Sequence, residues 1–362
     1  DGDCGRGTRE AVNDETTLCH DWVLTHDEIV DKKGPLQHPA RMIDRICIPV
    51  GEALSEVERV LENELVSNVK TIDSITGYLI GNGGKRIRPA LFLLSSRVVG
   101  LHGSPRQAAA IEMLHTASLL HDDVIDDAPV RRGYPSARAR WGNQASVLVG
   151  DFMLSRASMI FAQEGSAELL LALAQTMGHT TEGELLEIEH QSDAETGAET
   201  YMRIISGKTA SLFSFAAAAP AITASVGKQL EEAMRSFGLG VGQAFQLTDD
   251  ALDYVADEAC TGKSQGIDLR EGKLTYPLIV ALSKSTAKER ARIRSALISG
   301  SFAREEFRGI VDIVERNGGI ESTLRLARET AAKAKENLVF FKPSIERDSL
   351  AQLADYAVSR NR

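Results

Sequence analysis

The segment Met113–Gly133 constrains the fold more than any other part of the chain. It begins as an apolar helical run and then places four carboxylates within six positions: Asp122, Asp123, Asp126 and Asp127. Residues four apart lie on one face of a helix, and like charges at that spacing repel each other. A helix that keeps them needs a compensating cation, and hard oxygen ligands suit Mg²⁺. A single cluster would equally describe a solvated acidic helix end.

The same pattern occurs a second time, in Phe245–Asp253 (FQLTDDALD). Asp249, Asp250 and Asp253 again follow an apolar helical run, and Asp249 and Asp253 share a helix face. Magnesium uses one or two protein carboxylates and completes its shell with water and phosphate oxygens. Two acidic helix faces in one chain therefore predict a diphosphate that is held between them through several metal ions.

Basic residues accompany the first acidic segment and a glycine-rich loop. Arg131 and Arg132 directly follow the four aspartates, which puts guanidinium groups for anion binding beside a cation-binding wall. The loop Gly81–Pro89 carries three more cations, Lys85, Arg86 and Arg88. Cations at the N-terminus of a helix form an anion site, although a solvated basic turn has the same composition.

The overall composition excludes several classes of protein. Of 362 residues, 43% are hydrophobic and 25% are charged, and the formal net charge is −10. That charge argues against a nucleic-acid-binding protein, which usually carries a basic patch. The four cysteines are scattered without a CxxC pair, which argues against a disulfide framework. The charge-free run between Lys208 and Lys228 contains Pro220 and is mostly Ala, Ser and Thr, so we interpret it as a buried helix and expect no transmembrane segment.

The chain divides near residue 48. Residues 1–48 are polar and acidic and contain the breakers Gly34, Pro35 and Pro39, which predicts a mobile N-terminal extension. Residues 49–362 show helical periodicity throughout and no strand alternation, so we predict an all-α domain, a single large helical bundle.

Three glycines in this domain could suggest a nucleotide site. Gly238, Gly240 and Gly242 follow a helical pattern, and no βαβ unit surrounds them. We therefore interpret them as positions where helices pack closely.

Four motifs together resemble those of a known family. They are GGKRIRP at Gly83–Pro89, DDVID with the following RRG, FQLTDD, and GKSQGIDLREGKLTYP at Gly262–Pro277. In this order they are similar to the polyprenyl synthetase family, the trans-isoprenyl diphosphate synthases, over most of the chain beyond Val50. The resemblance is to the long-chain, octaprenyl-type branch that makes quinone side chains. It implies that the helical bundle encloses a deep apolar cavity.

The resemblance also implies roles for individual residues. The isopentenyl diphosphate site would consist of Lys85, Arg88, His115 and Arg132. The allylic diphosphate site would consist of Arg131, Lys208, Thr209, Gln246, Lys263 and Lys273. About three Mg²⁺ ions, or Mn²⁺ in their place, would be held by Asp122, Asp123, Asp126, Asp249, Asp250 and Asp253. The residues expected to act directly in catalysis are Asp122, Asp126, Asp249 and Lys208.

Short-chain members of the family commonly carry GQ and an Asp in the region of Gly183. Gly183–Glu184 and Glu187 stand at those positions here, which argues against an auxiliary metal or water role for Glu187.

The expected reaction is a Mg²⁺-dependent, head-to-tail condensation of isopentenyl diphosphate with an allylic diphosphate, by ionisation, condensation and elimination. Metal ions and cations would stabilise the departing diphosphate, so the protein supplies positioning and electrostatics in place of a covalent nucleophile. Three alternatives stay open: a short-chain synthase, a class I terpene cyclase, and a non-catalytic partner subunit of another synthase. Consumption of isopentenyl diphosphate separates a synthase from a cyclase.

Product length is predicted from the volume beneath the first acidic motif. Ala117 and Ser118 lie five and four residues before Asp122, where short-chain relatives tend to carry bulky aromatic residues. Each further helical turn adds ~5.4 Å of depth, about the length of one isoprene unit, so we expect a product of about C30 or longer. The residues expected to line this pocket are Ala117, Ser118, Leu114, Ile111 and Met153.

Three further expectations concern partners and location. The resemblance implies a homodimer, with two small-molecule diphosphates as substrates and no nucleic acid. A cytoplasmic location is expected, with peripheral contact to a membrane for product release.

Overall fold

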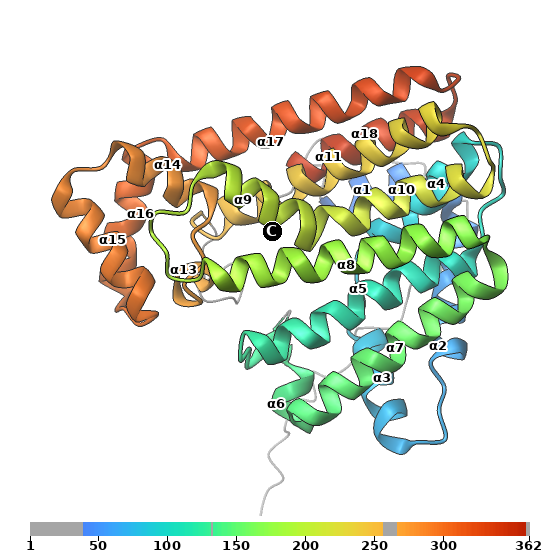
Figure 1. The fold of residues 1–362 in the computed structure, drawn as a ribbon, viewed down its shortest axis with the longest axis horizontal. Helices are drawn as coiled ribbons and strands as arrows, with labels where there is room; N and C mark the ends of the chain where they lie inside the picture. The colour runs from blue at the N-terminus through green and yellow to red at the C-terminus, as the bar shows by residue number, and fades with distance from the viewer. Residues whose placement is uncertain (1–38, 132, 256–265, 360–362) are drawn as a thin grey trace, which may run out of the picture. The chain divides into compact units, whose positions relative to one another are not determined.

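The computed structural model describes residues 39–131, 133–255 and 266–359, and Figure 1 shows how they are arranged. The first helices are α1 (Pro39–Cys47), α2 (Gly51–Glu64), α3 (Lys70–Gly81), α4 (Ile87–Val98), α5 (Pro105–Ile125), α6 (Ala137–Trp141), α7 (Asn143–Glu164) and α8 (Ala167–Glu189). They are followed by α9 (Ala198–Ile205), α10 (Ser211–Thr223), α11 (Lys228–Leu252), α13 (Ile267–Arg270), α14 (Tyr276–Lys284), α15 (Ala287–Ser299), α16 (Arg304–Arg316), α17 (Gly319–Glu336) and α18 (Ile345–Ser359).

The remaining elements are short. Two are 3₁₀ turns, η1 (Ile48–Val50) and η3 (Asn337–Phe340), and η2 (Ser206–Ala210) is a π-helical turn. The only sheet in the described residues is a two-stranded antiparallel hairpin, β1 (Val130–Arg131) with β2 (Tyr134–Pro135). The predicted all-α class is confirmed.

The helical domain begins earlier than the predicted boundary at residue 49. Helix α1 begins at Pro39, buries Ile43 and Ile46, and packs against α18. Proline breaks a helix in its interior, but it is compatible with the first position, where its missing N–H has no partner to lose. We had interpreted Pro39 only as a breaker. The rest of the predicted extension, residues 1–38, lies outside the described residues.

Helix α10 is the centre of the bundle. Every residue from Ser211 to Ile222 is buried, and α10 packs against α11, α4 and α8. A helix that is apolar on all faces is stable only inside a protein or a bilayer, and here neighbouring helices surround it (Figure 1). The interpretation of the charge-free segment as a buried helix is therefore confirmed.

The three glycines of α11 are packing positions, as predicted. A Cβ at Gly238 would collide with the carbonyl oxygen of Phe213 on α10, and one at Gly242 would lie 2.6 Å from the Cα of Ala210 in η2. A Cβ at Gly240 would meet Ala334 of α17 at 2.7 Å. The absence of side chains at these positions lets α11 approach three neighbours closely.

Among the described residues, α7 alone is long and apolar enough to cross a bilayer by length and composition. It packs extensively against α5 along its length, and 39% of its most apolar window is buried in the protein. A helix with these properties also occurs in the interior of water-soluble proteins.

A second, smaller hydrophobic cluster lies among α13, α14, α15 and α16. Tyr254, just beyond α11, stacks on Phe307 with the ring centroids 6.2 Å apart, and Phe302 stacks on the same ring. Through Tyr254, this cluster contacts the C-terminal end of α11.

Candidate active site

The two acidic motifs lie at the C-terminal ends of α5 and α11 and border one cavity. Asp122 in the last turn of α5 and Asp249 in the last turn of α11 both line a cavity of about 730 Å³. The C-terminal end of a helix carries partial negative charge, which disfavours carboxylates there. Both motifs therefore concentrate negative charge at a position where a cation is needed to offset it.

Eight more of the predicted site residues line the same cavity. They come from the glycine-rich loop and the start of α4, from α5, β1, η2 and α11, and they are Lys85, Arg88, His115, Ser118, Arg131, Lys208, Thr209 and Gln246. Segments more than 150 residues apart in the sequence thus border one space. Arg132 and Lys263 lie outside the described residues.

Within the first motif, neighbouring aspartates have different surroundings. Burial raises the pKa of Asp122 to about 7, although Lys208 and Arg131 partly oppose this shift. Asp123 is 2% exposed and accepts a hydrogen bond of 2.5 Å from Nε of Arg131, so its carboxylate is directed away from the shared cavity. Asp126 caps α5, and both of its oxygens lie 3.1 Å from Nζ of Lys273.

Within the second motif, the hydrogen-bond partners of Asp250 are neutral donors. Asp250 accepts hydrogen bonds from the hydroxyl of Tyr201 at 2.5 Å and from Nε2 of Gln246 at 2.7 Å. Burial nevertheless raises the pKa of Asp250 to about 7. Asp250 does not line the cavity that Asp122 and Asp249 share; it borders a smaller polar chamber of about 130 Å³ with Lys208 and Lys273.

Asp253, the last residue of the second motif, lies next to Asp268 of α13. Asp253 is buried, Asp268 is half-buried, and the backbone N–H of Asp268 is 3.4 Å from Oδ2 of Asp253. Burial and the neighbouring carboxylates, first of all Asp253, raise the pKa of Asp268 well above its usual range. Several carboxyl groups therefore lie close together at this end of α11.

The donor set fits magnesium that is shared with a diphosphate. Asp122 and Asp249 offer hard oxygen ligands, and Oε1 of Glu184, which lies near Asp122, is buried and accepts no hydrogen bond. In the described residues, no three His, Cys, Asp or Glu side chains converge as a closed metal site. That is expected for Mg²⁺, which keeps few protein ligands and fills its shell with phosphate oxygens and water.

The glycine-rich loop uses its three cations differently, contrary to the prediction that all three form an anion site. Arg86 adopts a left-handed backbone conformation (φ 48°), and its guanidinium pairs with Glu58 at 2.6 Å and Glu112 at 2.8 Å. It thereby ties the loop to α2 and α5. Lys85 lies 5.9 Å from the ring centre of Tyr356, and the guanidinium of Arg88 stacks over Phe213 at 4.3 Å.

The π-helical turn η2 brings Lys208 and Thr209 to the cavity. π-Helical turns are rare and occur frequently at functional sites. Gly207 lies in backbone contact with Gly183 of α8, where a Cβ on either residue would collide with the other segment. Because the backbones touch, Nζ of Lys208 reaches Glu184 at 2.8 Å and Glu187 at 2.5 Å. The sequence reasoning did not identify these two carboxylates as lysine partners.

A chain of hydrogen bonds links this turn to the second motif. The hydroxyl of Thr209 donates to Oε1 of Gln246 at 2.8 Å, and Nε2 of Gln246 donates to Asp250. The orientation of the Gln246 amide is therefore fixed at both ends. This network couples η2 to the C-terminal end of α11.

An apolar pocket of about 430 Å³ extends from Asp122 between α5, α7, α8 and α10. Of the five residues predicted to line it, Leu114 and Ser118 do so. Ala117, Ile111 and Met153 do not line it, because they are fully buried in helix contacts. The pocket face of α5 contains Leu114, Ser118 and Asp122 at intervals of four, and Ala117 lies about 100° around the helix from Ser118.

The deep end of this pocket was not predicted. It is formed by leucines from three other helices, Leu154, Leu173 and Leu212. Nothing local in the sequence marks them, because leucine at helical spacing is ordinary in a core.

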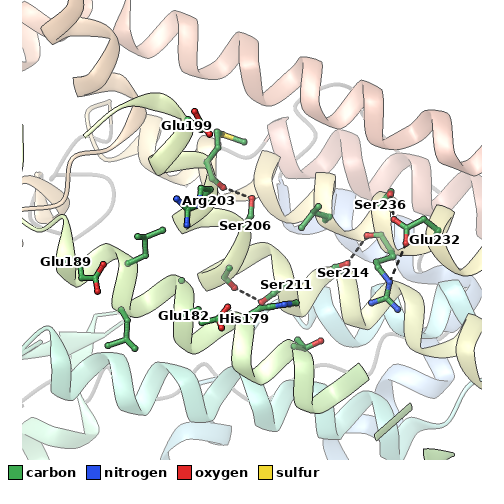
Figure 2. Close-up of a pocket in the computed structure, with 18 residues that line it drawn as sticks. His179, Glu182, Glu189, Glu199, Arg203, Ser206, Ser211, Ser214, Glu232 and Ser236 are labelled. Carbon is green, nitrogen blue, oxygen red and sulfur yellow. Dashed lines mark hydrogen bonds and ion pairs between the residues drawn. The ribbon is translucent and has the colours of Figure 1, made fainter. Parts of the chain in front are cut away.

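A larger groove of about 1060 Å³ lies on the opposite face of α8 (Figure 2). Its walls come from α8, α9, η2, α10 and α11, and they include the exposed Glu182 and Glu189. None of the predicted site residues lines it. Volume alone would therefore have indicated the wrong part of the molecule.

Comparison with known proteins agrees with this geometry. Residues 69–314 match the family model described as polyprenyl synthetase. The chain is 38% identical to the octaprenyl diphosphate synthase of Escherichia coli (strain K12) over 322 residues, which cover 88% of this chain and 99% of that protein. It is 36% identical to a short chain isoprenyl diphosphate synthase of Methanothermobacter thermautotrophicus, over 84% of this chain and 94% of that one.

A solved structure is also similar. The polyprenyl synthase of Caulobacter crescentus CB15, crystallised with calcium and isoprenyl diphosphate, superposes with a TM-score of 0.84 at 38% identity, over 88% of this chain and 98% of that one. The family uses isopentenyl diphosphate and allylic diphosphates and is generally magnesium-dependent. This chain belongs to the polyprenyl synthetase family and is a trans-polyprenyl diphosphate synthase, a prenyltransferase.

Proposed function

We propose that this enzyme uses Mg²⁺ to condense isopentenyl diphosphate with an allylic diphosphate and builds a long all-trans polyprenyl diphosphate of about C30 or more. The observation that carries this proposal is that Asp122 and Asp249 line one cavity together with Lys85, Arg88 and Lys208. Carboxylates for metal ions and cations for phosphates lie beside an apolar pocket that starts at Asp122.

Asp122, Asp126 and Asp249 would hold the metal ions, which neutralise charge on the departing diphosphate when bound. Lys208, Lys273 and Arg131 would orient the allylic diphosphate beside them; Lys263, in the same role, lies outside the described residues. Lys208 is well suited to this because burial lowers its pKa but Glu187 and Glu184 more than offset that effect, so the ammonium stays charged. Preorganised positive charge of this kind favours a transition state in which negative charge builds up on the leaving group.

Isopentenyl diphosphate would bind on the opposite side of the cavity. Lys85, Arg88 and His115 would hold its diphosphate, together with Arg132, which lies outside the described residues. The leucines that line the pocket, Leu114, Leu154, Leu173 and Leu212, are apolar and offer no nucleophile to the allylic cation. The double bond of isopentenyl diphosphate then attacks, and the released diphosphate takes the proton that is lost.

Purified protein incubated with Mg²⁺, an allylic diphosphate and labelled isopentenyl diphosphate tests the reaction. We expect label in an apolar product, and no incorporation when EDTA removes the metal. Product made from the allylic diphosphate alone would instead indicate a terpene cyclase. Incorporation only after addition of a second protein would indicate a non-catalytic subunit.

The depth of the apolar pocket limits how long a product chain it can hold. From Glu184 near its mouth to Leu173 at its deep end, α8 spans eleven residues, or about 16 Å at ~1.5 Å per residue. That length accommodates about three isoprene units. This observation favours a short-chain synthase as the second candidate, and a longer chain must displace Leu173 or leave the pocket sideways between α7 and α8.

Substitutions at Leu173 and Ser118 separate the two candidates. Leu173→Ala should lengthen the product and Ser118→Phe should shorten it, whereas Ala117→Phe should mainly destabilise the core. Chromatography of the products measures both shifts. A wild-type product of about four isoprene units, unchanged by Leu173→Ala, would contradict the long-chain proposal.

The enzyme would act as a homodimer. Helices α7 and α8 expose a set of large apolar side chains: Val147, Leu148, Met159, Leu170, Leu171, Leu185 and Ile188. Apolar surface of this extent usually marks an interface, and a second copy of the chain would cover it. Light scattering should give about twice the 39.2 kDa chain mass, and Leu148→Glu combined with Leu171→Glu should shift the protein to a monomer. We further propose a cytoplasmic enzyme that contacts the membrane only to release its apolar product.

A further inference from the structure

Glu187 lies between two lysines that come from different segments of the chain. Its Oε2 is 2.5 Å from Nζ of Lys208 in η2 and 3.6 Å from Nζ of Lys273, which follows α13. Each lysine has further carboxylate partners. Lys208 also pairs with Glu184 at 2.8 Å, and Lys273 also pairs with Glu271 at 2.8 Å and with Asp126.

Among the ion pairs of the described residues, Glu187 is the one carboxylate that contacts both lysines. The side chains of Lys208 and Lys273 are 20% and 14% exposed, so water screens their mutual repulsion poorly. A shared carboxylate at this position offsets that repulsion. Without it, the two ammonium groups would move apart.

The fold fixes Glu187 firmly. It lies in the last turn of α8, one turn beyond the Gly183–Gly207 backbone contact, and it borders the small polar chamber with Tyr201 and Asp250. Glu189, two residues later, lies on the other face of α8 and lines the larger groove shown in Figure 2. The geometry therefore distinguishes two glutamates of the same helix end.

We propose that Glu187 is a positioning residue, which holds Lys208 and Lys273 together as one clamp for the allylic diphosphate. This inference rests on the proposed roles of the two lysines. It assigns Glu187 to the lysines, and not to the metal ions. Isopentenyl diphosphate binding should not depend on Glu187, because Lys85 and Arg88 border the shared cavity, whereas Glu187 borders the smaller chamber.

The test is the steady-state kinetics of Glu187→Gln, with Glu189→Gln as the matched control. Glu187→Gln keeps the size of the side chain and removes its charge. We expect the KM for the allylic diphosphate to rise about tenfold and the KM for isopentenyl diphosphate to stay within about twofold. Glu187→Asp should recover most of the loss, and Glu189→Gln should match the wild type.

A double-mutant cycle with Lys273→Gln tests the coupling. If Glu187 acts through the lysines, Glu187→Gln should change the KM for the allylic diphosphate by less than about threefold once Lys273 is replaced. Fully additive effects would overturn the inference. So would an unchanged KM in Glu187→Gln alone.

A titration with Mg²⁺ separates the metal role. The Mg²⁺ concentration for half-maximal activity should be the same in wild type and Glu187→Gln, and a shift of about tenfold would overturn the inference by assigning Glu187 to the ions. Equal thermal unfolding midpoints of Glu187→Gln and Glu189→Gln confirm that the variants are folded. Inactive wild-type protein would contradict the proposed function itself, whereas active wild type with unaffected Glu187→Gln contradicts only this inference.

Discussion

The two acidic motifs share a sequence pattern but are held in the fold by different chemistry. The first motif is neutralised by charged partners, since Asp123 pairs with Arg131 and Asp126 pairs with Lys273. In the second motif, Asp250 is held by neutral donors, since it accepts hydrogen bonds from Tyr201 and Gln246. Of the adjacent pairs Asp122–Asp123 and Asp249–Asp250, only Asp122 and Asp249 line the shared cavity.

This difference indicates that the two aspartates of a pair have different roles. In each of these two pairs, one aspartate faces the cavity and the next, the anchor, accepts a hydrogen bond from a side chain that itself borders the cavity, Arg131 or Gln246. Charged partners hold an anchor strongly but leave a costly buried charge when one partner is lost. Neutral donors stabilise a buried carboxylate less than charged partners do, so the pKa of the carboxyl group is raised. The following predictions test this comparison.

The largest effect should come from the two cavity-facing carboxylates. Asp122→Asn and Asp249→Asn should each lower kcat by about 10³-fold, because each removes negative charge that holds metal ions against the leaving group. Incorporation of labelled isopentenyl diphosphate measures this. Asp127→Asn is the control, since this neighbour is 82% exposed and pairs with Arg138 at the surface. Loss of activity in the control would remove the distinction between cavity and surface carboxylates.

The anchors should differ in how much stability they contribute. Arg131→Gln leaves the carboxylate of Asp123 buried without its charged partner, and we expect a loss of about 3 kcal/mol in the free energy of unfolding. Tyr201→Phe removes one neutral donor from Asp250 and should cost about 1 kcal/mol. Urea denaturation measures both. The comparison fails if Tyr201→Phe proves the more destabilising of the two.

Magnesium dependence should change with pH because of Asp122. Burial raises the pKa of Asp122 to about 7, so a proton competes with the metal ion below that pH. We expect the Mg²⁺ concentration for half-maximal activity to rise about tenfold per pH unit below about pH 7 and to level off above it. Activity titrations at several pH values measure this. A flat profile between pH 6 and pH 8 would contradict the assignment.

The smallest effect should be a pH-dependent stability difference at the second motif. Burial raises the pKa of Asp250 to about 7, above its value in the unfolded chain, so the stability linked to its proton is present at low pH and is lost as the pH rises through 7. Asp250→Asn should therefore gain stability relative to wild type between pH 5 and pH 8, on the order of 2 kcal/mol. Thermal unfolding in EDTA, which excludes bound metal, measures it; a constant difference would contradict it.

Much of the site could be predicted because its motifs are local. The four-residue spacing of Asp122 and Asp126, and of Asp249 and Asp253, depends only on helix geometry. The buried character of α10 and the packing role of Gly238, Gly240 and Gly242 follow from composition in the same way. Where the reasoning failed, the cause was a neighbour distant in sequence. Arg86 borders the cavity, but its guanidinium is engaged by Glu58 and Glu112.

The chain-length pocket shows the same limit. A rotation of about 100° separates Ala117 from Ser118, and only the packing of α5 against its neighbours determines which of the two faces the pocket. The leucines at its deep end come from α7, α8 and α10, which the sequence places far from α5. Residue spacing cannot reveal which distant helices meet.

The sequence by itself determined that this chain forms helices and that two of them end in carboxylates, because periodicity and charge spacing act within a few residues. Tertiary structure alone decided which carboxylate of each pair borders the cavity and which lysines Glu187 holds. Those outcomes depend on contacts between segments tens to hundreds of residues apart, such as the touching backbones of Gly183 and Gly207. Close packing fixes such contacts, and no local pattern encodes them.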